Sequence, residues 1–176
     1  MKIECTIDGK ALTLSVNSNK PLSLIIMEDL ENQSLVSYCR GNACGNCVVL
    51  FNDEAALSCL IPAFRIRGAK IRTFESFQRS RQYRDIERAY KAVGSRPCPS
   101  CFNAKTLIIE SILQDLTTDT GQPSASTPSK EVVLDKAKVA RELSLNSCQC
   151  MDMAELIQIV EIALGYRNRR RRVRRS

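Results

Sequence analysis

The feature that most constrains this chain of 176 residues is a group of four cysteines near its N-terminus. Three lie within nine residues, at Cys39, Cys44 and Cys47, and Cys59 follows after eleven intervening residues. This is the plant-type spacing with which four thiolates hold a [2Fe-2S] cluster. Such a cluster carries one electron at a time, so the spacing predicts electron transfer rather than chemistry on a substrate. A zinc site or a chance group of cysteines is the alternative interpretation.

Four more cysteines form two close pairs, Cys98 with Cys101 and Cys148 with Cys150. Each pair precedes a segment with helical periodicity, so both are expected near helix N-termini, where free N–H groups and the helix dipole stabilise negative charge. The same environment lowers thiol pKa and favours the ligating thiolate. This suits a [2Fe-2S] cluster, whose iron (+6), sulfide (−4) and four thiolates (−4) sum to −2. Four thiolates also suit structural zinc, and spacing alone leaves both metals open.

The grouping of these cysteines indicates metal sites rather than disulfides. The remaining cysteine, Cys5, alternates with Ile3 and Ile7 and is expected to be a buried structural thiol. The sequence contains no histidine, which excludes Rieske ligation, zinc sites that use histidine, and acid–base catalysis by histidine.

Composition predicts a soluble globular protein, because 44% of the residues are hydrophobic and can form the core of one ordinary domain or two small ones. No apolar run approaches the roughly 18 residues that a membrane span needs. The segment from Met1 to Glu4 lacks the apolar core of a signal peptide. We therefore expect a cytoplasmic location.

The net charge of +7 comes from the C-terminus, where seven of the last ten residues are arginines, so the rest of the chain sums to 7 − 7 = 0. Binding to nucleic acid or to an anionic membrane is one interpretation of this Arg-rich tail, residues 167–176. However, no aromatic residues are interleaved with the arginines, as a nucleic-acid interface would favour. We expect a disordered tail.

Residues 1–77 are predicted to form an α+β domain. Alternating apolar residues on both sides of Asp8-Gly9 predict a β-hairpin. A helix with one apolar face is expected to enter through Pro21, capped by Ser18 or Asn19. The remaining expected elements are a strand at 48–51, a turn at 52–54, a short apolar segment around Cys59 and a strand at 70–74.

Residues 78–166 have helical spacing instead and are predicted to form a small four-helix bundle. The expected helices are a stripe from Tyr83 to Val93 that ends at Gly94, and segments at about 101–116, 130–143 and 152–165. Residues 117–129 are rich in Thr, Ser, Gly and Pro, which predicts a flexible loop.

Taken together, these motifs and their order resemble the iron-sulfur subunit of the molybdenum hydroxylase family, which includes xanthine dehydrogenase, aldehyde oxidoreductase and carbon monoxide dehydrogenase. The resemblance covers nearly the whole chain. The segments that carry it are 39–47, Ser58-Cys59-Leu60, the strand at 71–75, and the Cys98/Cys101 and Cys148/Cys150 pairs.

The resemblance implies a plant-type ferredoxin-like (β-grasp) domain that holds one [2Fe-2S] cluster through Cys39, Cys44, Cys47 and Cys59. It implies a second [2Fe-2S] cluster in the helical domain, held by Cys98, Cys101, Cys148 and Cys150. Electrons would pass from molybdopterin through the helical-domain cluster and then the ferredoxin-domain cluster to FAD. This chain is too short to contain either outer cofactor. The implied partners are therefore the molybdopterin-binding large subunit together with the FAD-binding medium subunit, and no catalytic residue is expected here.

The chain departs from the family pattern around Cys98. The family usually has a glutamine before this cysteine, on the side of the pterin, whereas Pro97 has neither an amide side chain nor a backbone N–H. Pro99 removes another backbone donor of the kind that tunes cluster potential. Pro97 favours an alternative function, a stand-alone ferredoxin-like electron carrier or redox sensor. A third function, a zinc-stabilised interaction module, would require zinc in the helical domain.

Overall fold

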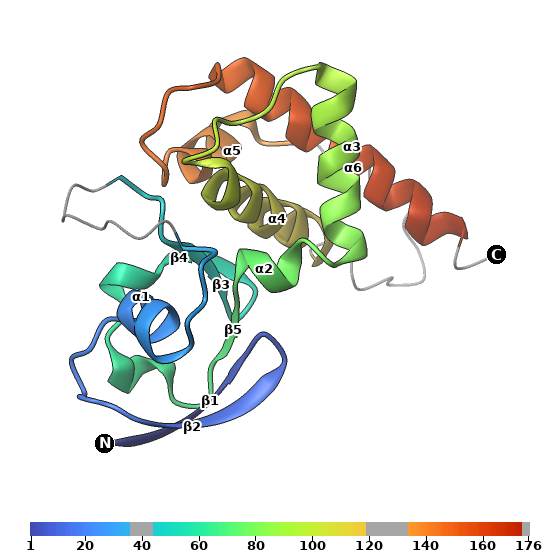
Figure 1. The fold of residues 1–176 in the computed structure, drawn as a ribbon. Helices are drawn as coiled ribbons and strands as arrows, with labels where there is room; N and C mark the ends of the chain where they lie inside the picture. Colours follow the sequence, from blue (N-terminus) through green and yellow to red (C-terminus); the bar gives the residue numbers. More distant parts are fainter. Residues whose placement is uncertain (36–43, 119–133, 174–176) are drawn as a thin grey trace.

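The computed structural model describes residues 1–35, 44–118 and 134–173 (Figure 1). Five strands form one sheet in the N-terminal part, in the order β2-β1-β5-β3-β4. The four longest helices, α3 to α6, lie together on one side of this sheet. The predicted α+β class, with a sheet first and helices after it, is confirmed. The division into domains 1–77 and 78–166 stays a prediction.

The predicted hairpin is confirmed and consists of β1 (Lys2–Ile7) and β2 (Lys10–Ser15), which pair antiparallel. Asp8 and Gly9 join them with φ angles of 52° and 81°, the positive values that a two-residue hairpin turn requires. Cys5 on β1 is buried as expected, and burial raises the pKa of its thiol.

Strand β5 (Lys70–Arg72) lies in the middle of the sheet, parallel to β1 and antiparallel to β3. It ends two residues before the predicted boundary because Thr73 turns to bond with Asp8. The Thr73 N–H donates to Asp8 Oδ1 at 2.7 Å, and the Thr73 hydroxyl donates to Asp8 Oδ2 at 2.8 Å. The short helix α2 (Phe74–Phe77) begins directly afterwards.

The helix expected after Pro21 is one α-helical turn, α1 (Leu22–Leu24), followed by a π-helical turn, η1 (Ile25–Asp29). The predicted cap at Ser18 or Asn19 is wrong, because Pro21 is the N-cap residue and makes no side-chain cap bond. The Leu22 N–H donates instead to the backbone oxygen of Ile61 at 2.8 Å. Two 3-10 helices flank this contact, η2 (Ser58–Leu60) and η3 (Ala63–Ile66).

The four predicted helices of the C-terminal part are confirmed as α3 (Arg81–Val93), α4 (Phe102–Thr118), α5 (Lys136–Leu143) and α6 (Met153–Val173). Helix α3 ends at Gly94, whose φ of 76° is the left-handed C-cap conformation. Helix α5 begins later than predicted because the Asp135 side chain caps it, accepting from the N–H groups of Ala137 and Lys138.

The loop predicted at 117–129 falls mostly on residues outside the described ranges. Its first two residues, Thr117 and Thr118, belong to α4.

Strand β3 (Val48–Phe51) connects the two hydrophobic clusters of the molecule. Val49 packs among the apolar residues of β1 and η1, whereas Val48 and Leu50 pack in the cluster built by the helices. Helix α4 contacts β3 and β4 (Glu54–Leu57) on one side and α3, α5 and α6 on the others. The sheet is therefore covered on both faces at β3.

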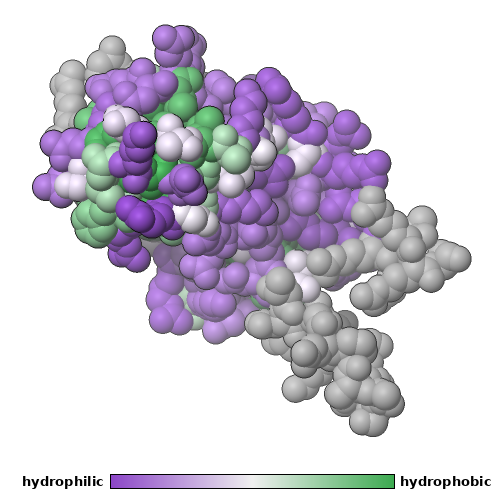
Figure 2. Space-filling model, turned by 90° about the horizontal axis from the view of Figure 1, so that it is seen from below, coloured by the Kyte–Doolittle hydropathy of each residue, from purple (hydrophilic) through white to green (hydrophobic). Residues whose placement is uncertain are grey.

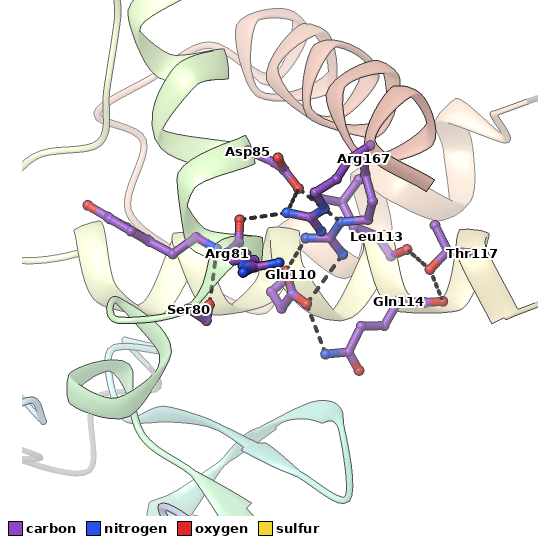
Figure 3. A network of polar contacts seen from close by, with 10 residues as sticks. Ser80, Arg81, Asp85, Glu110, Leu113, Gln114, Thr117 and Arg167 are labelled. Carbon is purple, nitrogen blue, oxygen red and sulfur yellow. Dashed lines mark hydrogen bonds and ion pairs between the residues drawn. The ribbon is translucent and has the colours of Figure 1, made fainter. Parts of the chain in front are cut away.

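The prediction of a disordered Arg-rich tail is wrong as far as Val173, because α6 continues through that residue. Arg167 is only 3% exposed, and its side chain extends from α6 towards α3 and α4 (Figure 3). Its guanidinium donates to both carboxylate oxygens of the fully buried Glu110, at 3.3 and 2.5 Å. A planar guanidinium that donates twice to one carboxylate is the strongest common ion-pair geometry.

Asp85 on α3 is the second acidic residue that contacts arginines of α6. Its Oδ2 lies 3.7 Å from Arg167 Nε and 2.8 Å from Arg170 Nη1. Arg170 also donates to the backbone oxygen of Arg81 at 2.8 Å. Burial raises the pKa of Asp85, while Arg170 and Arg167 favour its charged form. The end of α6 is thus attached to α3 and α4 by charge.

Gly45 marks a close approach between the N-terminal cysteine segment and the loop before α6. Its φ is 69°, and a Cβ atom built on it would overlap the Leu145 backbone oxygen and lie 2.6 Å from Asn146 Cα. No side chain fits there without moving backbone. Gly68 has the same φ of 69° and nothing within 4 Å of a built Cβ.

The face of the molecule seen in Figure 2 is mostly polar, with an apolar area over the N-terminal part. Three large apolar side chains of the described residues are exposed, Met1, Leu60 and Phe64. Within the described ranges, no helix has both the length and the hydropathy needed to cross a bilayer.

We predict that Arg167→Ala lowers the free energy of unfolding by about 3–5 kcal/mol, because it leaves Glu110 as a buried carboxylate without its partner. Urea denaturation measures the change. Arg169→Ala is the control: Arg169 is exposed on the same helix and contacts the Tyr166 ring, so its loss should change stability by no more than about 0.5 kcal/mol. Equal losses in the two variants would contradict the role of the buried pair.

We predict that Gly45→Ala destabilises the chain more than Gly68→Ala. Both replacements force alanine into a left-handed conformation, at a cost of about 1–2 kcal/mol. Gly45→Ala also places a methyl group against the Leu145 backbone, which should add roughly 1–3 kcal/mol. Paired urea denaturation curves test this, and a difference near zero would show that the two segments separate easily.

Candidate metal centre

Four of the predicted ligands come together in the helical part. The sulfur atoms of Cys98, Cys101, Cys148 and Cys150 all lie within 4.8 Å of one another. The Sγ atoms of Cys98 and Cys101 are 3.3 Å apart, those of Cys101 and Cys150 are 3.3 Å apart, and those of Cys98 and Cys148 are 3.7 Å apart. Two sequence segments fifty residues apart thus form one thiol cluster.

Helix starts position these thiols, as predicted. The Cys98 backbone oxygen accepts from the N–H groups of Cys101 and Phe102, at 3.1 and 2.9 Å, and so forms the turn that leads into α4. Cys148 and Cys150 come just before α6. The Cys98 N–H points at the other pair and donates to Cys150 Sγ at 3.3 Å.

Cys98 and Cys101 differ in acidity because they differ in burial and in hydrogen bonding. The pKa of Cys98 is lowered to about 6, first by the Ser100 hydroxyl 3.0 Å from its sulfur and then by the Cys101 thiol. Cys101 is fully buried, and burial raises the pKa of its thiol. Cys98 is therefore a more acidic thiol than Cys101. Ser100 was not predicted from the sequence, although it lies between the two cysteines of a pair.

The donor set fits a thiophilic metal, since it consists of four sulfurs without a carboxylate or imidazole. One ion with metal–sulfur bonds of about 2.3 Å would hold four sulfurs about 3.8 Å apart in a tetrahedron. The three sulfur–sulfur distances given above, 3.3 to 3.7 Å, approach that value. A [2Fe-2S] cluster also uses four thiolates, two on each iron, and needs the two pairs further apart.

The first predicted set is described only in part, because Cys39 lies outside the described residues. Cys47 precedes β3, and Cys59 follows β4. The β3–β4 pairing places Cys47 opposite Ser58, whose N–H and hydroxyl donate to the Cys47 backbone oxygen at 3.0 and 2.7 Å. Among the described residues, Cys44, Cys47 and Cys59 do not form a sulfur group as close as the second set. Their role as ligands stays a prediction.

Asn146 connects the two cysteine regions and was not predicted from the sequence. Its side-chain amide donates to the backbone oxygens of Cys44 and Gly45 and to the side-chain oxygen of Asn46, at 3.2, 3.1 and 2.7 Å. Its own side-chain oxygen accepts from the Cys148 N–H at 3.2 Å. Asparagine side chains often accept from the backbone N–H two residues further on, in an Asx-turn. This local signal for the contact with Cys148 was available in the sequence.

Residues 5–64 match the 2Fe-2S iron-sulfur cluster binding domain. The matched range contains Cys39, Cys44, Cys47 and Cys59. A domain of this kind binds a one-electron carrier, which supports an electron-transfer role and an iron-sulfur cofactor.

Relatives extend the similarity to almost the whole chain. It is 25% identical over 167 residues to one of the subunits of nicotinate dehydrogenase from Pseudomonas putida, covering 95% of this chain and 97% of the relative. It is 28% identical over 161 residues to the xanthine dehydrogenase iron-sulfur-binding subunit of Escherichia coli O157:H7, covering 90% of this chain and 91% of the relative.

The fold is also shared with a solved structure, quinoline 2-oxidoreductase from Pseudomonas putida 86. The TM-score is 0.71 at 23% identity, and the match covers 97% of this chain and 96% of that chain. The resemblance predicted from the cysteine motifs is thereby confirmed. Residues 5–64 thus match a [2Fe-2S] cluster binding domain, and the chain is similar over most of its length to the iron-sulfur-binding subunit of xanthine dehydrogenase and to a subunit of nicotinate dehydrogenase.

Proposed function

We propose that this chain is the two-cluster electron-transfer subunit of a molybdenum-hydroxylase-type oxidoreductase. One [2Fe-2S] cluster would be held by Cys39, Cys44, Cys47 and Cys59, and the other by Cys98, Cys101, Cys148 and Cys150. A molybdopterin-binding subunit would supply the electrons and a FAD-binding subunit would accept them. The cytoplasmic location predicted from the sequence is part of this proposal.

The observation that carries the proposal is the gathering of Cys98, Cys101, Cys148 and Cys150 from two distant segments. The domain match at 5–64 ends before these residues and supports only the first cluster. A second four-thiol site gives the chain two places for one-electron carriers, as a relay requires. Cys150 is exposed and Cys98 and Cys148 are half-buried, so a partner can approach the second site closely.

The residues of the chain supply ligation and electrostatics rather than substrate chemistry. When bound, each cluster would accept and release one electron. The Cys98 N–H donates to Cys150 Sγ and the Ser100 hydroxyl lies beside Cys98 Sγ, and both contacts stabilise the negative charge of a thiolate. The low pKa of Cys98 favours its thiolate, the form that binds metal, at neutral pH.

A second candidate is a chain with one cluster and one structural zinc. Three sulfur–sulfur distances in the second set, of 3.3 to 3.7 Å, favour it, because they approach those around a single tetrahedral ion. Metal content distinguishes the two candidates directly.

A third candidate keeps both clusters but lacks the molybdopterin partner, and Pro97 beside the second site favours it. Purification of the native protein separates it from the first. Recovery of a stable complex with molybdopterin and FAD subunits supports the relay, whereas a lone monomer that carries clusters supports a separate carrier or sensor.

We predict about four irons and four acid-labile sulfides per chain after anaerobic purification, with two distinguishable S = 1/2 EPR signals after reduction. Iron and sulfide assays, zinc analysis and EPR on the same sample provide the test. Two irons with one zinc and a single signal would contradict the second cluster and favour the zinc candidate.

We predict that Cys44→Ser removes one EPR signal and Cys148→Ser removes the other, because each takes a thiolate from one site. Cys5→Ala is the matched control: Cys5 is buried in the N-terminal core, outside both sets, so both signals should remain. Loss of both signals in Cys44→Ser would show that the second site depends on the first for folding.

A further inference from the structure

The backbone oxygen of Cys44 is the point where the two predicted cluster sites touch. Three donors converge on it at 3.2 Å: the Ser147 N–H, the Ser147 hydroxyl and the Asn146 side-chain amide. Ser147 is covalently bonded to Cys148. The shortest connection from Cys44 to Cys148 therefore crosses one hydrogen bond, from the Ser147 N–H to the Cys44 oxygen.

Asn146 holds this contact from the inside. Asn146 is only 3% exposed, and its side chain bonds both to residues 44–46 and to Cys148. Its amide group reaches Cys44, Gly45 and Asn46, while its oxygen accepts from the Cys148 N–H. A buried amide with all of these partners is costly to displace.

The neighbouring residues leave this arrangement little freedom. Gly45 lies against the Leu145 backbone and Asn146 so closely that a methyl group would overlap with both. A closely packed contact has few alternative conformations. The packing around Asn146 therefore fixes the distance between the two ligand segments.

We propose that Asn146 is a positioning residue for electron exchange between the two cysteine sites, which it supports by keeping the Ser147 N–H on the Cys44 oxygen. This inference rests on the proposed function, because it requires a cluster at each site. The route leads from the Cys44 backbone through the hydrogen bond to Ser147 and along the chain to Cys148. Asn146 adds a second link in parallel through its side chain.

The step is a transfer of one electron. With a cluster bound at each site, one ferrous iron at the donor site would be oxidised to ferric and one ferric iron at the acceptor site would be reduced to ferrous. No covalent bond forms or breaks and no proton has to move, so a fixed separation between the sites is the requirement that the protein must meet.

The informative variant is Asn146→Asp. Aspartate keeps an oxygen for the Cys148 N–H, but it has no N–H to donate and brings a negative charge towards the oxygens of Cys44, Gly45 and Asn46. Asn146→Asp therefore weakens the contacts with residues 44–46 and keeps the contact with the Cys148 N–H. Asn146→Leu removes the contacts with residues 44–46 and the contact with the Cys148 N–H. Ser144→Ala is the matched control, since it removes an exposed hydroxyl contact with the Ala140 oxygen in the same loop and leaves every contact of Asn146 and Ser147 in place.

Two measurements on the full chain test the proposal. The first is residue-resolved hydrogen exchange, with the Ser147 and Cys148 amides as reporters. The second is the rate at which an electron moves between the sites after rapid one-electron photoreduction. Iron and sulfide assays and EPR on each variant establish that both sites are loaded.

In Asn146→Asp we expect the Ser147 amide to exchange about ten- to a hundredfold faster, while the Cys148 amide stays protected. Electron exchange should slow, and the magnetic interaction between the two reduced sites should change. In Asn146→Leu both amides lose protection. Ser144→Ala should match the wild type in hydrogen exchange and in electron-transfer rate.

An Asn146→Asp chain with four irons and a wild-type electron-exchange rate would overturn this inference and leave the proposed function intact. An unchanged Ser147 amide would overturn it as well. Two irons and one zinc in the wild-type chain would overturn both proposals together. Faster Ser147 exchange without slower electron transfer would show that Asn146 stabilises the fold only, which also rejects its role in the relay.

Discussion

Burial of β3 on both faces is the constraint on which the rest of the structure depends. Val49 belongs to the N-terminal core, and Val48 and Leu50 belong to the helical core, so one strand serves two hydrophobic clusters. A run of four apolar residues suits a strand that is covered on both sides. Cys47 directly precedes this strand, and the β3–β4 pairing places Ser58, next to Cys59, opposite Cys47. The core therefore determines where two of the first-set cysteines lie.

The second cysteine set is built on a different plan. Its ligand candidates come from two helix starts, and their mutual position depends on how α4 and α6 pack. The contact from Asn146 and Ser147 to Cys44 then relates this set to the first one. The two sites are thus positioned by one continuous set of contacts that begins at β3, passes through α4 and closes at the loop before α6.

Local signals in the sequence predicted much of this fold. The Asp8-Gly9 hairpin, the Gly94 helix end and the four helices all depend on residues within a few positions of one another, and so did the cysteine spacing that suggested metal sites. The features that could not be predicted depend on distant partners. Leu22 bonds to Ile61, Thr73 bonds to Asp8, and Asn146 bonds to Cys44. Asp135 is an exception, because its capping role is local and was missed.

The end of α6 changes how the charge of this chain should be understood. Seven arginines in ten residues look like a uniform cationic segment, but Arg167 is inside the protein against Glu110, and Arg170 is paired with Asp85. Two of the seven positive charges are therefore largely cancelled at short range. Long-range attraction of polyanions depends on uncompensated surface charge, so this segment produces a weaker field than its composition suggests.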